Sequence, residues 1–149
     1  MKRLVVFISI LLGCFLSLPA QKSKILAVFQ LIETGKYEDA KEEIEKAIED
    51  KKTSQWHRTW YAKGVLCQTA YQKGIAEKDP KKYELYPDQL YVAFHSYRKA
   101  WSLDKRGKLD ETLAPRYVLL ANEFQSLGAE HFRKGEHVKA LKAFEEAIQ

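Results

Sequence analysis

Apolar residues recur at steps of three and four along most of the chain that follows residue 20. Such steps place side chains on one face of an α-helix, so the pattern predicts a succession of amphipathic helices. Thr53 or Ser54 is expected to cap the third helix, and Ile75 to lie on its buried face. Pro115 is expected in the first turn of the fifth. The predicted helices span about residues 22–34, 37–50, 55–76 and 88–103, with two more beginning near residues 113 and 136.

A sequence pattern recurs three times along these helices. Residues 35–48 and 135–148 each open with a glycine, which predicts a tight turn, and continue with apolar residues four and three positions apart. The same apolar offsets occur once more between them. Alanine at these positions is small enough to let a neighbouring helix approach closely. The packing positions of the three copies are Ala40, Ile44 and Ala47, then Ala93, Tyr97 and Ala100, then Ala140, Phe144 and Ala147.

Upstream of the second and third copies lie Trp60 and Gly64, four residues apart, and the pair Leu127-Gly128. Together with the alanine positions, these residues resemble the tetratricopeptide repeat, a helix–turn–helix of about 34 residues. The resemblance implies an all-α fold, a right-handed α-solenoid of about three helix hairpins. The expected domain covers residues 21–149, with units of about 21–54, 55–104 and 112–149. Ala40 and Ala93 are 53 residues apart and Ala93 and Ala140 are 47 apart, which indicates two insertions.

The first insertion is expected to be a long loop over residues 77–89, because Pro80 and Pro87 disfavour helix in the residues before them. Loops of this length are often functional. Tyr83, Leu85 and Tyr86 form either a knob that faces a partner or a lid that folds back on the helices, and the lid is the favoured interpretation. The second insertion is expected over residues 104–112.

The amino terminus predicts export from the cell. Lys2 and Arg3 precede an apolar run that extends to residue 18, and Ala20 is small enough for a signal peptidase, so residues 1–20 read as a signal-peptide helix. The chain is then expected in the periplasm or envelope of a bacterium, or secreted. An alternative interpretation uses the segment Leu-Leu-Gly-Cys that ends at Cys14, which resembles a lipidation site. Association with a membrane is expected only if Cys14 is lipidated.

Composition narrows the choice of partner. The chain of 149 residues has a formal net charge of +5, and removal of Lys2 and Arg3 with the signal lowers this to +3. So small a charge does not favour nucleic acid, which requires a concentrated basic face. Removal of residues 1–20 would also leave Cys67 as the only cysteine, so no disulfide could form within the chain. A protein or peptide is therefore the expected partner.

No arrangement of reactive residues predicts catalysis or a metal site. His57, His95, His131 and His137 share no ligand spacing. Cys67 falls at a core-facing repeat position, and no base is placed to activate it. We therefore expect no enzyme activity and no cofactor.

The resemblance implies that the first helix of each hairpin lines a concave groove for a polypeptide partner. The alternative is that Ile25, Phe29 and Phe132 only pack against loops or an adjoining unit. The basic and asparagine cluster by which some co-chaperone repeats clamp a terminal carboxylate is not reproduced, so that ligand is not predicted. The groove residues carried over from the family are Lys22, Ile25, Phe29 and Ile32, then Arg58, Tyr61, Val65 and Gln68, and finally Asn122, Gln125, Ala129 and Phe132.

Two functions from different classes are consistent with this pattern. The first is an exported interaction module or scaffold. The second is a structural subunit of a larger envelope assembly. The second follows from the expectation that the last helix has no capping helix, so that Phe144 and Ile148 would be covered by another subunit.

Overall fold

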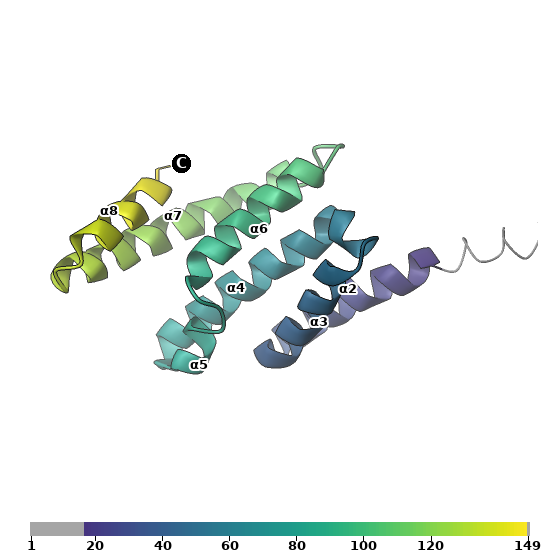
Figure 1. Ribbon diagram of the computed structural model, residues 1–149, viewed down its shortest axis with the longest axis horizontal. Helices are drawn as coiled ribbons and strands as arrows, with labels where there is room; N and C mark the ends of the chain where they lie inside the picture. The colour runs from purple at the N-terminus through teal and green to yellow at the C-terminus, as the bar shows by residue number, and fades with distance from the viewer. Residues whose placement is uncertain (1–16, 149) are drawn as a thin grey trace, which may run out of the picture.

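The computed structural model describes the backbone of residues 17–148 and the side-chain surroundings of residues 23–148, and this part of the chain is all-helical with no strand (Figure 1). The predicted all-α class is confirmed. The predicted signal peptide, residues 1–20, lies outside the described residues except for residues 17–20, which belong to the first turn of α2. The helices are α2 (Ser17–Glu33), α3 (Tyr37–Glu49), α4 (His57–Glu77), α5 (Pro80–Tyr83), α6 (Gln89–Leu103), α7 (Asp110–Arg133) and α8 (His137–Glu146), with a single 3₁₀ turn, η1 (Thr53–Gln55), before α4.

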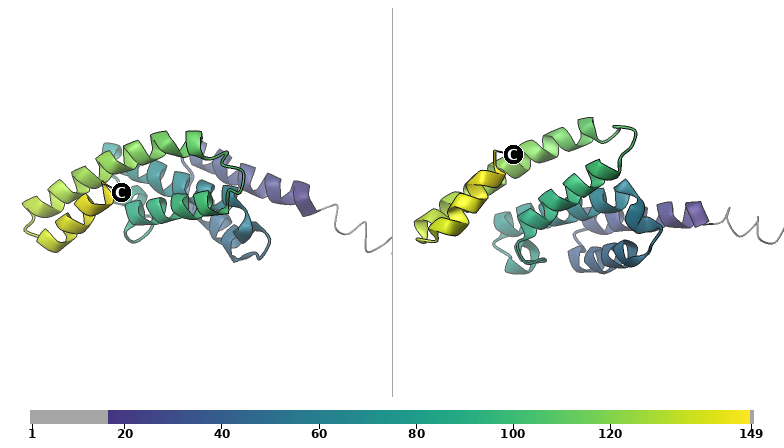
Figure 2. Two further views of the ribbon diagram at one scale, coloured as in Figure 1. Left: turned by 90° about the horizontal axis from the view of Figure 1, so that it is seen from above. Right: turned by 45° about the horizontal axis from the view of Figure 1, so that its top comes forward.

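The long helices pair as three consecutive hairpins, α2 with α3, α4 with α6 and α7 with α8, which lie side by side in chain order (Figure 1). Seen from above, α2, α4 and α7 lie along one side of the array and α3, α6 and α8 along the other (Figure 2). We call α2, α4 and α7 the first helices of the hairpins. Helix α4 occupies the centre, because it packs against α2, α3, α5 and α6.

The turns of the outer hairpins are built alike. Gly35 and Gly135 adopt φ angles of +74° and +76°, which only glycine reaches without strain. In the first turn the amide of Lys36 donates to the carbonyl of Leu31 at 2.9 Å, and in the second the amide of Glu136 donates to the carbonyl of His131 at 2.9 Å. Both bonds span five residues, as in a Schellman motif. The sequence repeat at residues 35 and 135 is therefore also a repeat of backbone hydrogen bonds.

Each of the second and third hairpins is held together by an aromatic ring over a glycine. A Cβ atom built on Gly64 would lie 2.4 Å from the ring of Tyr97, and one built on Gly128 would lie 2.7 Å from the ring of Phe144. Both rings come from the second helix of the hairpin and sit at the aromatic position of the repeat. The absence of a side chain on the glycine lets the two helices approach closely.

The repeat alanines occupy the contacts between helices. Ala40, Ala93 and Ala140 are between 0 and 2% exposed, although they lie on three different hairpins. Phe144 is 39% exposed even though its ring covers Gly128, so the third hairpin is packed less tightly than the second.

Two helix starts differ from the prediction. Helix α7 begins at Asp110 and not near residue 113, so Pro115 lies inside the helix beyond its first turn. The carboxylate of Asp104 fixes this start by accepting the amide of Leu109 at 2.7 Å, which shortens the second insertion. Thr53 does not cap α4. Its hydroxyl donates to the carbonyl of Ala47 and closes the end of α3.

The first insertion folds back on the helices, as the favoured interpretation predicted, but it is not a loop throughout. It contains α5, which packs against α4 so closely that a Cβ atom on Gly74 would lie 2.5 Å from the backbone nitrogen of Tyr83. Leu85 is 3% exposed. The side chain of Gln89 pins the segment, because its Nε2 atom donates to the carbonyls of Cys67 at 2.8 Å and Lys82 at 2.9 Å.

The insertion also contacts the first hairpin. The hydroxyl of Tyr86 donates to Oε1 of Glu45 at 2.6 Å, and the ammonium of Lys41 donates to the carbonyl of Leu85 at 2.7 Å. Lys41 and Lys63 lie 4.8 and 5.0 Å from the centre of the Tyr86 ring. Burial and the bond to Glu45 raise the pKa of Tyr86. These contacts join the second hairpin to α3.

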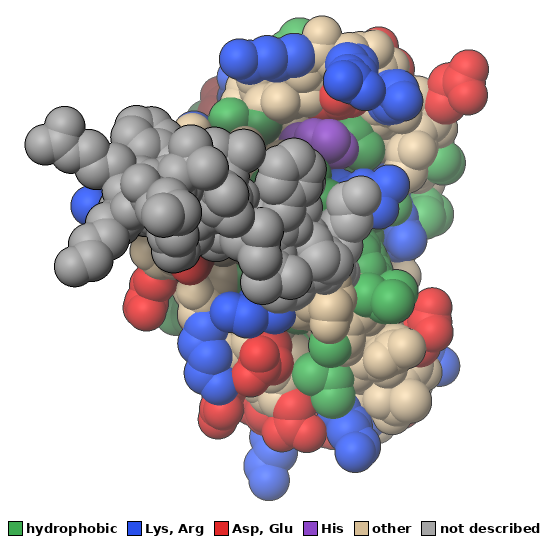
Figure 3. All heavy atoms as spheres, turned by 90° about the vertical axis from the view of Figure 1, so that its right-hand side faces the viewer, with side chains coloured by type: hydrophobic (Ala, Val, Ile, Leu, Met, Phe, Trp, Pro, Cys, Tyr) green, Lys and Arg blue, Asp and Glu red, His purple; other side chains and the backbone are tan. Residues whose placement is uncertain are grey.

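Figure 3 looks onto the end of the array formed by α2 and α3, and acidic and basic side chains are mixed over its lower half. Within residues 17–148, no helix combines the length and the apolar character needed to cross a membrane.

Candidate partner-binding site

The first helices of all three hairpins contribute to one surface hollow of about 370 Å³, which we call the Tyr61 hollow. Apolar, polar and charged side chains meet there, and three of the apolar ones, Ile32, Tyr37 and Val65, are buried. Its lining residues are Phe29, Ile32 and Glu33 of α2, Tyr37 of α3, Tyr61, Val65, Thr69 and Lys73 of α4, and Arg116 of α7.

Helical spacing explains why these residues meet. Phe29 and Ile32 are three residues apart on α2, and Tyr61, Val65 and Thr69 follow one another at steps of four on α4. Side chains at such spacings project from one face of a helix. Since α2 and α4 pack together, their two faces form adjoining walls.

Aromatic rings form one wall. The ring centres of Phe29 and Tyr61 are 6.0 Å apart and the ring planes are tilted by 44°. Tyr61 is in turn 6.0 Å from Tyr97, which is fully buried beneath it. Phe29 and Tyr61 are both half-buried. Each therefore offers part of an aromatic surface to a ligand while the remainder is supported from below.

A buried polar network fixes α7 to α4 and α6 beside this wall. Tyr97 donates its hydroxyl to Oε1 of Gln68 at 2.9 Å. Nε2 of Gln68 then donates to the carbonyl of Arg116 at 3.2 Å and to Oε2 of Glu123 at 3.1 Å, and Gln72 donates to the other carboxylate oxygen. Burial raises the pKa of Glu123, although both glutamine bonds act in the opposite direction. The network determines where the backbone of Arg116 lies.

The predicted groove residues separate into three groups. Phe29, Ile32, Tyr61 and Val65 line the Tyr61 hollow, although Ile32 and Val65 are only 5% and 6% exposed. Two others are buried and do not line it. Ile25 is 2% exposed and packs in the core, and Gln68 is 0% exposed with its amide engaged inside the protein.

Of the remaining predicted groove residues, those whose side chains are described do not line the hollow. Arg58 is exposed and its guanidinium lies 5.8 Å from the centre of the Trp56 ring. Lys22 belongs to α2, but its side chain is outside the described part. Asn122, Gln125, Ala129 and Phe132 are exposed on α7 and do not line the hollow. Five lining residues were not predicted, namely Glu33, Tyr37, Thr69, Lys73 and Arg116. Thr69 and Lys73 continue the steps of four from Tyr61 and Val65 on α4, whereas Tyr37 and Arg116 are identified only by their approach in space.

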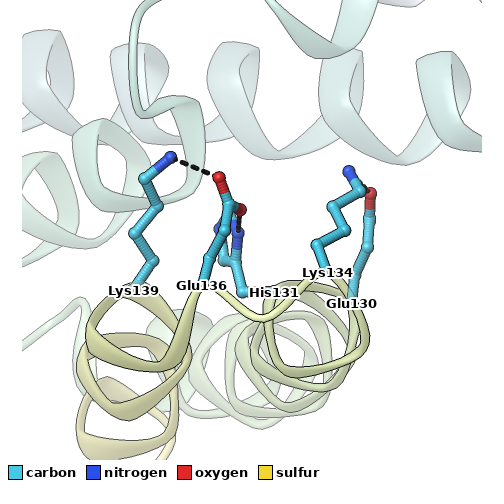
Figure 4. A network of polar contacts seen from close by, with 5 residues as sticks. All are labelled: Glu130, His131, Lys134, Glu136 and Lys139. Carbon is cyan, nitrogen blue, oxygen red and sulfur yellow. Dashed lines mark hydrogen bonds and ion pairs between the residues drawn. The ribbon is translucent and has the colours of Figure 1, made fainter.

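Two other hollows flank α7. A cleft of about 710 Å³ lies between its carboxyl-terminal part, the first insertion and α4, and an apolar hollow of about 540 Å³ lies between α6, α7 and α8. Figure 4 shows polar residues of α7, α8 and the turn between them, of which Glu130, His131 and Lys134 also line the cleft. Here Glu136 binds both Nζ of Lys139 at 2.9 Å and Nδ1 of His131 at 2.6 Å, and these two bonds lower its pKa to about 2.

No reactive centre is assembled among the described residues. Cys67 is 0% exposed, and burial raises the pKa of its thiol to about 12. A thiol in this state is a poor nucleophile at neutral pH. No three His, Cys, Asp or Glu side chains within the described range are grouped so that they could hold a metal ion.

No model of a known protein family, no curated protein and no solved structure matches this chain. A function for this chain is therefore inferred from its sequence pattern and from the geometry of the hollow.

Proposed function

We propose that this protein is an exported interaction module of the tetratricopeptide-repeat type, which binds a protein or peptide segment along the first helices of its hairpins. In this proposal the three hairpins form a short right-handed α-solenoid. The buried alanine at the same position of each hairpin and the matching turns at Gly35 and Gly135 support a repeat array. The long spacing between Ala40 and Ala93 is accounted for by α5 and its flanking segments, which are inserted between α4 and α6.

The single observation that carries the proposal is the composition of the Tyr61 hollow. Residues predicted independently to face a groove, among them Phe29 and Tyr61, meet there with Arg116 of the third hairpin. A hollow that draws on all three first helices recognises a ligand only when the whole array is folded. Concave sites with apolar walls and a few polar groups are the usual form of binding sites.

Site-specific photo-crosslinking in the producing cells tests this proposal. A photoreactive phenylalanine analogue replaces Tyr61 in one variant and Lys99 in the control. Lys99 is exposed on α6, on the opposite side of the array from the first helices. We expect one discrete crosslinked product from position 61 and none from position 99. Equal labelling at both positions, or none at either, would contradict a binding site in the hollow.

Export is part of the proposal and rests on the sequence of residues 1–20 alone. The intact mass of the protein recovered from cells, together with its fractionation, tests it. Cleavage after Ala20 gives an unmodified chain that begins at Gln21, whereas the alternative gives a lipid-modified Cys14. A full-length chain found only in the cytoplasm would refute export.

A structural subunit is the second candidate, and exposed side chains on α8 favour it. Val138 is 84% and Leu141 60% exposed, three residues apart on α8, and Ile148, just beyond the end of that helix, is 84% exposed. Self-association through this part of the chain would cover them. Sedimentation analysis over a hundredfold range of concentration distinguishes the two candidates, since a chain that stays monomeric throughout contradicts a self-assembling subunit.

A further inference from the structure

The Tyr61 hollow contains more positive than negative charge. Arg116 and Lys73 line it together with a single acid, Glu33. Among the residues the structure describes, no carboxylate lies within ion-pair distance of the side chain of Arg116 or of Lys73. Most ion pairs elsewhere in the described range are local, between residues three to five apart. The two cationic side chains that line the hollow, Arg116 and Lys73, therefore form no ion pair with another described residue.

Arg116 is the more informative of the two cations, because it is half-buried. Burial raises the pKa of Glu123, and the charge of Arg116 acts to lower it. No carboxylate of the described residues contacts the guanidinium directly, so the burial of Arg116 is not matched by an ion pair. The bond from Gln68 to its backbone carbonyl keeps the residue at the edge of the hollow. The planar guanidinium can bind both oxygens of a carboxylate at once, which a lysine cannot do. The charge of the hollow is thus complementary to a carboxylate.

The aromatic wall adds a second requirement. Phe29 and Tyr61 present half-buried rings, and the buried apolar side chains of Ile32 and Val65 also line the hollow. A volume of about 370 Å³ lies near the small end of the range for ligand pockets, about 300–1,000 Å³. The hollow therefore suits a few side chains of an extended segment better than a whole helix. Glu33 on the α2 rim would repel a second acid placed there.

From these features we propose that the Tyr61 hollow binds an internal peptide segment in which an acidic side chain is adjacent to an aromatic or aliphatic one. The acid pairs with Arg116 and Lys73, and the apolar neighbour packs on Phe29 and Tyr61. This inference rests on the proposed function and names the chemistry of its partner. It concerns a side-chain carboxylate within a segment, not a free chain terminus.

Selection from a library of random dodecapeptides tests the inference on the full chain. The peptides are displayed at the amino terminus of their carrier, so that none has a free carboxyl end and any enriched carboxylate is a side chain. Selection is run on the wild type and on variants Arg116→Gln, Lys73→Gln and Tyr61→Ala, with Lys99→Gln as a control cation outside the hollow. Circular dichroism verifies that each variant is folded. Synthetic copies of selected peptides, amidated or with a free carboxyl end, are then measured by fluorescence anisotropy.

We expect selected peptides to carry Asp or Glu next to an apolar residue. Their affinity should fall by about tenfold to a hundredfold in Arg116→Gln, the loss typical of a charge-assisted bond, and should be unchanged in Lys99→Gln. Because counter-ions screen such a pair, affinity should also fall as salt is raised. Amidation should make no difference, and a peptide that needs its free carboxyl end would overturn the inference in favour of a terminal ligand.

The remaining outcomes separate the inference from the proposed function. Peptides that lose binding in Tyr61→Ala but show no enrichment in acids, and that bind Arg116→Gln normally, would overturn the inference and leave the proposed function intact. If no selected peptide loses binding in Tyr61→Ala, both are wrong.

Discussion

Replacing Gly64 by alanine should destabilise the protein, although alanine is the better helix former. A Cβ atom at this position would lie 2.4 Å from two atoms of the Tyr97 ring, far inside van der Waals contact. The ring has little room to move. It is fully buried, its hydroxyl is bonded to Gln68, and the rings of Tyr61 and Tyr117 lie 6.0 and 6.1 Å from it.

The change in the free energy of unfolding is the sum of two destabilising contributions and one stabilising contribution. Overpacking of this kind costs about 1–3 kcal/mol, and the upper half applies because the ring is confined. Loss of the bond between Tyr97 and Gln68 costs about 1 kcal/mol more. The higher helix propensity of alanine offsets about 1 kcal/mol. The free energy of unfolding should therefore fall by about 2–3 kcal/mol. For a domain of this size that corresponds to a drop in Tm of about 8–12 °C.

Gly128 provides a matched comparison, since it meets the equivalent ring in the third hairpin. A Cβ atom there would lie 2.7 Å from Phe144, but that ring is 39% exposed and can swing toward solvent. Gly128→Ala should thus change the free energy of unfolding by less than about 1 kcal/mol, because the gain in helix propensity nearly balances a small packing cost. Urea denaturation followed by tryptophan fluorescence measures both variants.

The first hairpin suggests a compensating pair. There Val28 and Ile44 occupy the positions of the glycine and the ring, and both are buried. The double variant Gly64→Val/Tyr97→Ile should consequently be more stable than the sum of its two single variants predicts, by about 1 kcal/mol or more. Strict additivity, or a Gly64→Ala protein at least as stable as the wild type, would refute the packing argument.

Three further predictions concern other parts of the fold. Gly74→Ala should displace α5 from α4, because its Cβ would lie 2.5 Å from backbone; limited proteolysis should then cut faster within residues 78–88. Cys67, with its pKa raised to about 12 by burial, should resist thiol reagents at pH 8 until denaturant is added, as peptide mass spectrometry can show. Bonds from Lys139 and His131 depress the pKa of Glu136 to about 2. The contribution of Glu136 to stability is therefore complete above about pH 4.5 and is lost toward pH 2. Glu136→Gln should remove that part of the acid dependence, as denaturation at several pH values can show.

The sequence sufficed for the helical class and for the positions where helices meet, because both depend on local periodicity. On helix α4 local periodicity did not identify the buried residues correctly. The third helix was expected to bury one stripe that includes Ile75, yet Ile75 is 50% exposed while Ala62, Leu66 and Ala70 are fully buried. A helix with neighbours on several sides has no single apolar face. Its packing partners decide which residues are covered, and those partners are distant in the sequence.

The buried amides could not have been predicted for a related reason. Gln68 was expected to line the groove and no pattern marked Gln89 as buried, because a buried amide requires partners that satisfy its hydrogen bonds. Those partners lie far away along the chain. Gln68 bonds to groups on α6 and α7, and Gln89 to the carbonyl of Cys67 on α4. The place of Arg116 at the hollow could not be predicted for the same reason, since it depends on the hydrogen bond from Gln68 to its backbone carbonyl.

This network joins helix packing to the proposed binding site. The close fit of Gly64 against Tyr97 sets the position of the tyrosine hydroxyl, which holds Gln68, which in turn binds the backbone of Arg116. A side chain at position 64 that shifts the ring should therefore also move the guanidinium. Gly64→Ala should weaken binding of an acidic peptide severalfold at temperatures where the protein is still folded, whereas Gly128→Ala should leave the affinity unchanged. Anisotropy titrations at 10 °C test this, and equal affinities for the two variants would show that the hollow does not depend on the packing beneath it.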